Sequence, residues 1–170
     1  MRDIKAVIRD IPDFPKPGIL FRDITPLLLD AAVFRETVEQ ICLPFLNRVD
    51  VVVGVESRGF IVGAAVAYHL GTGLALVRKP GKLPAATFEA RYDLEYGTDG
   101  LQIHQDAFHH GSRVLIVDDL LATGGTACAT VELVRRTGGE VVGCAFVIEL
   151  AELGGRKRLG PMEIHSLAKY

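Results

Sequence analysis

The chain has 170 residues, of which 49% are apolar and 24% charged, and this globular composition and length predict a single domain over residues 1–170. Its formal net charge of −2 argues against a general nucleic-acid or membrane-surface binder, so we expect neither nucleic acid nor membrane among its partners. No apolar run approaches the roughly 20 residues needed to span a bilayer, and the amino terminus lacks the apolar core of a secretory signal.

The amino-terminal stretch predicts a short helix, a rigid loop and a strand. Residues 4–11 have the pattern of a short amphipathic helix that ends before Pro12. Prolines in residues 12–18 exclude regular structure, because each one fixes φ and disfavours helix in the preceding residue. We interpret this stretch as a rigid loop, and a proline-rich ligand for a partner domain is the alternative. Residues 19–26 read as a strand-like piece, in which Phe21 either stacks on a flat ligand or belongs to the core.

The next segment predicts a helix, a strand, a polar turn and a second helix. Asp30 is a candidate N-cap for a helix through about residue 46, whose apolar stripe we assign to the core. Residues 49–55 are almost wholly aliphatic, as in a parallel strand covered on both faces. A polar turn at residues 56–59 follows directly, and a helix is expected over residues 60–70.

A basic turn follows the next predicted strand, residues 73–77. Arg78, Lys79 and Lys82 place three cations within five residues, a density that suits a highly charged anion such as pyrophosphate. A solvated basic turn is the alternative interpretation. Residues 85–106 then alternate polar residues with tyrosines and glycines, which predicts a two-stranded flap.

The most informative stretch lies between residues 114 and 126. Residues 114–117 predict a buried strand, Asp118 and Asp119 follow it, and the small residues 122–126 open a helical pattern. Loop amides and a helix amino terminus can bind a phosphate, and glycines allow its close approach. The carboxylates would repel that phosphate, but they can accept hydrogen bonds from ribose hydroxyls or bind a divalent metal. We therefore expect a ribose 5-phosphate site here, with a helix cap and an ordinary turn as the alternative.

The carboxyl-terminal part completes a repeated strand–helix pattern. A glycine pair at residues 138–139 is expected to end the preceding helix, and residues 140–150 and 162–167 predict two further strands. Residues 151–160 read as a polar connection with a solvated basic turn at residues 156–158. The pattern predicts an α/β fold with a twisted parallel sheet of about five strands and helices on both faces. The polar turns would then share the carboxyl edge of the sheet, where ligands bind.

The cysteines bear on the cellular compartment. Cys42, Cys128 and Cys144 are widely spaced and match no zinc or disulfide pattern. We expect them to be buried free thiols in a reducing compartment, and hence expect a cytoplasmic protein.

Four short motifs carry a resemblance to a known family. The stretch from Asp118 to Thr126 resembles the binding signature for 5-phosphoribosyl 1-diphosphate (PRPP) in the type I phosphoribosyltransferases. The motifs at residues 21–24, 56–60 and 94–97 are similar to those of the adenine branch of that family. The likeness covers nearly the whole chain, from residue 14 to its end.

The resemblance implies a fold and a reaction. The fold is type I phosphoribosyltransferase-like, with a flexible flap over about residues 83–106 and a small hood over about residues 1–30. The reaction is purine salvage, in which adenine and PRPP give AMP and pyrophosphate. Mg²⁺ would be held mainly by PRPP and water, with no direct metal ligand from the protein, and the protein would be a homodimer. A phosphoribosyltransferase for hypoxanthine, guanine or xanthine and a non-catalytic PRPP-binding regulator are the alternatives.

Carried over residue by residue, the resemblance implies how the base is bound. Adenine would lie against the ring of Phe21, with backbone groups of Leu20 and Arg22 at its edge. Glu95 would meet a nitrogen of the base. The expected catalytic residues are Glu95, Arg58 and Tyr96.

The resemblance also implies how the anionic parts of PRPP are bound. The expected pyrophosphate-binding residues are Glu56, Ser57, Arg58, Arg78, Lys79 and Lys82. The peptide between Glu56 and Ser57 is expected to be cis, and the family's counterpart of Arg78 often reaches the neighbouring subunit's active site. The expected ribose-binding and phosphate-binding residues are Asp118, Asp119, Ala122, Thr123, Gly124, Gly125 and Thr126.

Overall fold

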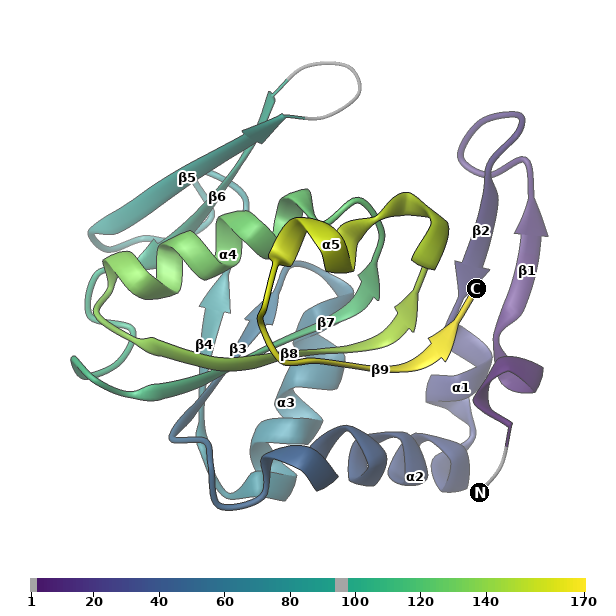
Figure 1. Ribbon diagram of the computed structural model, residues 1–170, viewed down its shortest axis with the longest axis horizontal. Helices are drawn as coiled ribbons and strands as arrows, with labels where there is room; N and C mark the ends of the chain where they lie inside the picture. Colours follow the sequence, from purple (N-terminus) through teal and green to yellow (C-terminus); the bar gives the residue numbers. More distant parts are fainter. Residues whose placement is uncertain (1–2, 94–97) are drawn as a thin grey trace.

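A five-stranded parallel sheet forms the centre of the structure (Figure 1). The computed structural model describes residues 3–93 and 98–170 of the chain. In spatial order the strands are β4 (Gly73–Val77), β3 (Val51–Val55), β7 (Arg113–Leu121), β8 (Glu140–Glu149) and β9 (Ile164–Lys169). Each neighbouring pair is parallel, so the predicted α/β fold with five parallel strands is confirmed.

Helices cover both faces of this sheet (Figure 1). The helices on one face are α1 (Thr25–Leu29), α2 (Ala31–Cys42) and α3 (Arg58–Leu70), and those on the other are α4 (Gly125–Arg136) and α5 (Gly155–Leu159). Short 3₁₀ turns are η1 (Ile4–Val7), η2 (Leu43–Phe45) and η3 (Ala151–Leu153). Because α3 connects β3 to β4 and α4 connects β7 to β8, the turns that begin these helices meet at the carboxyl edge of the sheet.

Two antiparallel hairpins complete the architecture (Figure 1). One consists of β1 (Arg9–Pro12) and β2 (Leu20–Asp23), and the other of β5 (Thr87–Asp93) and β6 (Thr98–His104). The β5–β6 hairpin packs against α4, and its two strands were predicted between residues 85 and 106.

The central strand β7 is covered on both faces, and this explains why residues 114–117 are all aliphatic. The residues from Val114 to Val117 are fully buried. Val114 and Ile116 pack on the side of α4, whereas Leu115 and Val117 pack on the side of α2 and α3. Successive side chains of a strand point to opposite faces, so a strand covered on both faces needs an apolar residue at every position. Full burial of each such side chain contributes roughly 1.5–3 kcal/mol.

Helix α2 starts where the sequence predicted and ends earlier. The Asp30 carboxylate accepts hydrogen bonds from the backbone N–H groups of Ala32 (2.9 Å) and Val33 (3.1 Å), which confirms the N-cap. The predicted end near residue 46 is wrong, because the α-helix stops at Cys42 and continues only as the 3₁₀ turn η2. Pro44 accounts for the change, since it lacks the N–H group that the next α-helical hydrogen bond requires.

The predicted helix over residues 4–11 is also wrong, because only η1 is helical and β1 replaces its second half. Pairing with β2 and an ion pair favour the strand: Arg9 Nη2 lies 2.6 Å from Asp23 Oδ2. Asp23 is buried, and hydrogen bonds from the Thr25 backbone and from Arg9 lower its pKa to about 2. These tertiary contacts outweigh the local helical pattern, which is a weak preference in so short a segment.

The segment from residue 151 to residue 160 is more ordered than predicted. It forms η3 and α5, and Arg156 is not a solvated turn residue. Its guanidinium donates to both carboxylate oxygens of the buried Glu149, at 2.8 and 2.6 Å. Hydrogen bonds from Arg156 lower the pKa of Glu149 to about 2, which keeps the pair charged at neutral pH. This pair fixes α5 against the end of β8, and Lys157 and Arg158 are exposed as expected.

Two further expectations concern the cysteines and the membrane. All three cysteines are free, but only Cys42 and Cys144 are buried, whereas Cys128 is half-buried. The expectation of three buried thiols is therefore wrong at Cys128, which lies on α4 beside the α5 backbone. Within the described ranges, no helix is long and apolar enough to cross a bilayer.

Candidate functional site

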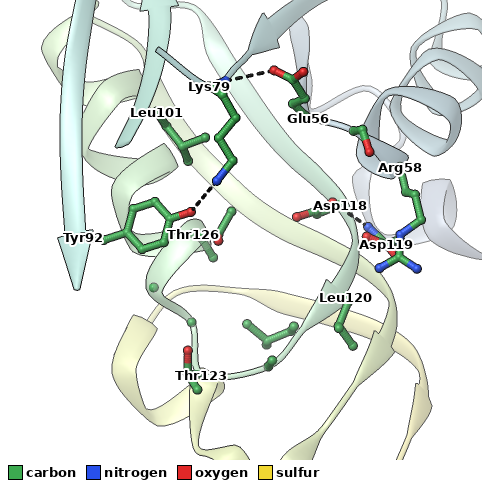
Figure 2. Close-up of a pocket in the computed structure, with 16 residues that line it drawn as sticks. Glu56, Arg58, Lys79, Tyr92, Leu101, Asp118, Asp119, Leu120, Thr123 and Thr126 are labelled. Atoms are coloured by element: carbon green, nitrogen blue, oxygen red, sulfur yellow. Dashed lines mark hydrogen bonds and ion pairs between the residues drawn. The ribbon is translucent and has the colours of Figure 1, made fainter. Parts of the chain in front are cut away.

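A cavity of about 330 Å³ lies at the carboxyl edge of the sheet (Figure 2). Segments far apart in the sequence form its walls: the turn after β3, the turn after β4, the β5–β6 hairpin and the end of β7 with the loop that follows. Of the residues predicted from sequence, it is lined by Glu56, Ser57, Arg58, Lys79, Asp118, Asp119, Ala122, Thr123, Gly124, Gly125 and Thr126. The fold thus brings most of the predicted anion-binding residues together.

The cavity exists because β7 is longer than its neighbour β3. The register between these strands ends at the pair Gly54–Val117, while β7 continues to pair with β8 as far as Leu121. The predicted strand end at Val117 is therefore wrong. The extra residues follow from the length of β8, which offers backbone partners for them. Beyond the Gly54–Val117 pair β7 is no longer paired with β3, and residues 118–121 contribute to the lining of the cavity, although Leu120 and Leu121 also pack against the two cores.

Asp118 and Asp119 are adjacent carboxylates at the base of this cavity (Figure 2), where Asp119 is buried and Asp118 is half-buried. Burial and the charge of Asp119 raise the pKa of Asp118 well above its usual value. Burial also raises the pKa of Asp119, although the charge of Arg58 opposes that shift. Groups whose charge is disfavoured in this way are typical of ligand-binding sites, where a ligand supplies the missing stabilisation.

Arg58 is the closest cation to the acid pair. Its Nε lies 2.9 Å from Asp119 Oδ2 without hydrogen-bond geometry, and this buried oxygen accepts no hydrogen bond from any residue that the structure describes. An unsatisfied buried acceptor is costly, on the order of 1–3 kcal/mol. A ligand hydroxyl at this position would remove that cost.

The turn from β3 into α3 approaches the acid pair closely. The peptide between Glu56 and Ser57 is cis, as expected. A Cβ atom on Gly59 would lie 2.6 Å from Asp118 Oδ1 and 3.0 Å from the Val117 carbonyl oxygen. Glycine is therefore required at residue 59 for the first turn of α3 to lie against β7.

The loop 122–126 has the form of an anion cradle. Gly124 adopts a φ of +82°, a left-handed conformation that favours glycine, and Gly125 begins α4. Behind the loop lies Gly155, the first residue of α5. A Cβ atom there would approach the Ala122 carbonyl oxygen to 2.3 Å and the Gly124 nitrogen to 3.1 Å. The shape of the loop therefore depends on a residue about thirty positions away in the sequence.

The basic turn contributes only one of its three cations to the cavity. Lys79 lines it, whereas Arg78 and Lys82 do not. Arg78 donates to both oxygens of Glu56, at 3.2 and 3.1 Å, and the backbone N–H of Lys79 donates to the same carboxylate at 2.9 Å. Burial works to raise the pKa of Glu56, but these hydrogen bonds prevail and lower it. Glu56 thus holds the basic turn in place as a charged group.

The residues predicted to bind a base lie on the β1–β2 hairpin, outside the cavity walls. The ring of Phe21 lies 4.9 Å from the Arg58 guanidinium, which links this hairpin to the acid pair. Leu20 is exposed, and the side chain of Arg22 forms an ion pair with Asp10. β2 pairs with β1 along one edge in the described sheet, so alternate backbone groups of β2 point away from β1. Two predicted catalytic residues, Glu95 and Tyr96, lie outside the described residues.

Sequence reasoning missed three residues of the β5–β6 hairpin that the structure places in or beside the cavity. Tyr92 and Leu101 line it from the β5–β6 hairpin. Asp99 forms an ion pair with Lys79, and the Tyr92 hydroxyl also donates to Asp99 at 3.2 Å. The alternation of the hairpin sequence could have placed Tyr92 and Leu101 on one face. Nothing in the sequence could have paired Asp99 with Lys79, because the hairpin must first fold over the basic turn.

Comparisons with known proteins agree with this geometry. A model of the phosphoribosyl transferase domain matches residues 28–167. The adenine phosphoribosyltransferase of Trichlorobacter lovleyi is 56% identical over 171 residues, with 100% of both chains covered. The solved adenine phosphoribosyltransferase from Thermoanaerobacter pseudethanolicus superposes with a TM-score of 0.95 and 52% identity over 98% of each chain. The Saccharomyces cerevisiae enzyme, solved with D-2,5-dideoxy-2,5-imino-altritol 1,6-bisphosphate and adenine, gives a TM-score of 0.92 at 39% identity over 96% of each chain.

The contact between Gly155 and the loop predicts that Gly155→Ala weakens binding of ribose 5-phosphate, measured by calorimetry, by about tenfold or more. The added methyl must displace the loop, and a shift of roughly 1 Å at a binding site can cost up to about a hundredfold. Gly73→Ala is the matched control, because its methyl meets no atom within 4 Å. Unchanged affinity in a folded Gly155→Ala protein would show that the loop does not depend on this contact.

Proposed function

Because this chain belongs to the adenine phosphoribosyltransferases of the phosphoribosyltransferase family, we propose that it converts adenine and PRPP into AMP and pyrophosphate in purine salvage. The observation that carries this proposal is one cavity holding both a small-residue loop at a helix start and two adjacent carboxylates. The chain spans the full length of relatives that bear the enzyme's name, and a yeast relative was solved with adenine.

The loop 122–126 would bind the 5-phosphate through its backbone N–H groups and the hydroxyls of Thr123 and Thr126. The acid pair would accept hydrogen bonds from the two ribose hydroxyls. The unsatisfied Oδ2 of Asp119 supports this assignment, because it is a buried acceptor without a hydrogen-bond donor among the described residues. The sugar would thus be held at both ends before the reaction begins.

The leaving pyrophosphate would lie between the turn at residues 56–58 and the basic turn. Arg58 and Lys79 face the cavity and can stabilise the charge that develops as the bond to the ribose carbon breaks. Ser57 adds a hydroxyl and a backbone N–H group. Arg78 would act indirectly, by holding Glu56 and with it the position of Lys79.

Mg²⁺ is part of the proposal and fits the residues present. Mg²⁺ commonly uses one or two carboxylates together with substrate phosphates and water. The acid pair at the cavity base offers at most two carboxylates. Across the described ranges, no group of three or more His, Cys, Asp or Glu residues could hold a metal. The ion would be held mainly by PRPP and water, and it would neutralise charge on the diphosphate.

The adenine ring would be placed between the cavity and the β1–β2 hairpin. Phe21 would stack on the base, and backbone groups of Leu20 and Arg22 would bind its edge. Stacking on an aromatic ring is worth roughly 1–3 kcal/mol. The link from Phe21 through Arg58 to Asp119 supports this placement, because it puts the ring next to the proposed ribose site. Glu95 and Tyr96 would complete the catalytic group from the flap.

An exposed apolar surface supports a homodimer. Leu29 of α1 and Tyr68 of α3 are 87% and 91% exposed, and they border a groove of about 510 Å³ between α1, α2 and α3. Clustered apolar groups that face water usually mark an interaction site. We propose that a second copy of the chain covers this surface. We also place the protein in the cytoplasm, where a reducing environment suits its free cysteines.

The first experiment is an assay of nucleotide formation from PRPP with adenine, hypoxanthine or guanine. We expect rapid AMP formation, at least about a hundredfold slower reaction with the other purines because site hydrogen bonds would stay unpaired, and loss of activity when the metal is chelated. Preference for another purine would contradict the adenine assignment. PRPP binding without any nucleotide formation would instead favour a regulator.

A second prediction concerns Glu95. We expect Glu95→Gln to lower kcat by roughly a hundredfold or more while the Kd for PRPP stays within about twofold, because a proton-transfer group acts on the base and not on the sugar phosphate. Single-turnover rates and calorimetry separate the two quantities. Equal losses in turnover and PRPP affinity would contradict a general-base role.

The proposed dimer can be tested by light scattering. The native protein should have twice the 18.4 kDa mass of one chain. Tyr68→Glu should shift it to the monomer, because a charge buried in an apolar interface is strongly disfavoured. Leu153→Glu is the control, since Leu153 is a half-exposed apolar residue away from this groove. A native protein of 18.4 kDa would contradict the dimer.

A further inference from the structure

Lys79 is the only lysine among the described residues that line the cavity, and its acidic partner lies beside the cavity. Lys79 Nζ lies 3.4 Å from the Tyr92 hydroxyl of β5 (Figure 2), and it also forms an ion pair with Asp99 of β6. The Tyr92 hydroxyl donates to Asp99 at 3.2 Å, so the three groups contact one another. These contacts join the basic turn after β4 to the hairpin that covers it.

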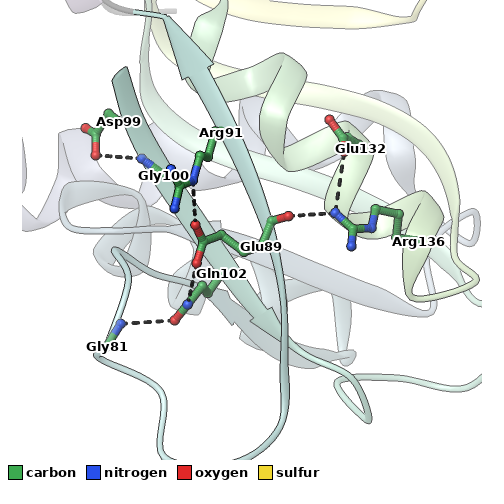
Figure 3. A network of polar contacts seen from close by, with 8 residues as sticks. All are labelled: Gly81, Glu89, Arg91, Asp99, Gly100, Gln102, Glu132 and Arg136. Carbon is green, nitrogen blue, oxygen red and sulfur yellow. Dashed lines mark hydrogen bonds and ion pairs between the residues drawn. The ribbon is translucent and has the colours of Figure 1, made fainter. Parts of the chain in front are cut away.

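Asp99 is the fixed member of this group. Its second oxygen, Oδ1, accepts a hydrogen bond from the Gly100 N–H at 2.8 Å, which fixes the carboxylate to its own strand (Figure 3). Lys79 has a long flexible side chain that is 41% exposed. The hydrogen bond from Lys79 lowers the pKa of Asp99, and contact with Asp99 raises the pKa of Lys79 against the effect of burial. Both groups are therefore charged at neutral pH.

This pairing affects how a diphosphate can bind. An ammonium group has three N–H donors, and Asp99 and Tyr92 occupy two of them. A diphosphate at the cavity would meet a cation whose charge is already neutralised, with a carboxylate next to it. Like charges repel, and a half-shielded pair is screened less than one in open water. The anion must therefore compete with Asp99 for Lys79.

We propose that Asp99 is the resident counter-ion of Lys79: it holds the lysine while the cavity is free, yields it to the diphosphate of PRPP, and takes it back as pyrophosphate leaves. Asp99 is thus a positioning residue that acts through Lys79. The exchange limits how tightly the product is held, because the lysine has a partner ready on β6 when pyrophosphate departs. This inference rests on the proposed PRPP site.

The test is Asp99→Asn, which keeps the side-chain shape and the contact with Gly100 while removing the charge. Calorimetry would measure the Kd for PRPP and for pyrophosphate with Mg²⁺, and kinetics would measure product inhibition by pyrophosphate. We expect both anions to bind about two- to fivefold more tightly, the scale of one partly exposed ion pair, and the inhibition constant to fall in parallel. A purely structural role for Asp99 predicts the opposite sign, because a disordered lysine would bind anions more weakly.

Glu89→Gln is the matched control. Glu89 lies on the neighbouring strand of the same hairpin, pairs with Arg91 and Gln102, and does not line the cavity (Figure 3). It removes the same charge as Asp99→Asn, but Glu89 contacts Arg91 and Gln102 and not Lys79, so both affinities should stay unchanged. Asp99→Glu keeps the charge and should bind both anions less tightly than Asp99→Asn.

Three results would overturn the inference: unchanged or weaker anion binding in Asp99→Asn, equal tightening in Glu89→Gln, or equal tightening in Asp99→Glu. Thermal unfolding of each variant would verify that it is folded. Failure of the native protein to bind PRPP would be a different result, since it would refute the proposed function and not the role of Asp99 alone.

Discussion

The site depends on the central strand β7, which extends beyond its neighbour β3. β7 pairs with β8 through Leu121 but pairs with β3 only as far as Val117, so residues 118–121 have a sheet partner on one side and the cavity beside them, where the acid pair lies. Backbone hydrogen bonds to β8, on one side alone, are enough to keep this end of β7 extended. The extension also places two carboxylates next to each other where water is partly excluded. Burial disfavours the charged form of both carboxylates and raises their pKa values.

The rest of the site can be understood as support for this acid pair. Arg58 supplies a nearby positive charge and also contacts Phe21, so one side chain joins the sheet edge to the β1–β2 hairpin. Gly59 permits the close approach of α3, and Gly155 permits the close approach of α5 from the other side. The buried Glu149–Arg156 pair fixes α5 in that position. Binding residues on loops are thus positioned by packed elements behind them.

Few cations of the site are left to bind a ligand, because most are paired with carboxylates or lie outside the cavity. Of the three in the basic turn, Arg78 binds Glu56, Lys82 lies outside the cavity, and Lys79 alone lines the cavity. That lysine is paired with Asp99 from the hairpin. A cavity lined by many unpaired cations would bind anions tightly and release them slowly. Pairing each cation with a carboxylate moderates the field that a diphosphate meets.

The sequence alone was sufficient for the features that are local or periodic. The aliphatic run at residues 114–117 implied a doubly covered strand, and Asp30 implied a helix start. The order of strands, acids, glycines and helices implied the sheet and its binding edge, because ligand sites in parallel sheets follow from topology. The family motifs pointed to most of the residues that line the cavity.

Other features were decided by tertiary structure. Residues 9–12 are a strand because β2 pairs with them, Arg156 is paired because the end of β8 lies beside it, and only Lys79 of the basic turn enters the cavity. The pairing of Asp99 with Lys79 and the packing of Gly155 behind the loop belong to the same class. Most of these contacts join residues that are distant in the chain, and even the Glu149–Arg156 pair, seven residues apart, forms only once α5 packs beside the end of β8, so no local pattern encodes which groups will meet. The sequence determined which chemical groups are present, and the packing of the sheet, helices and hairpins determined which of them meet.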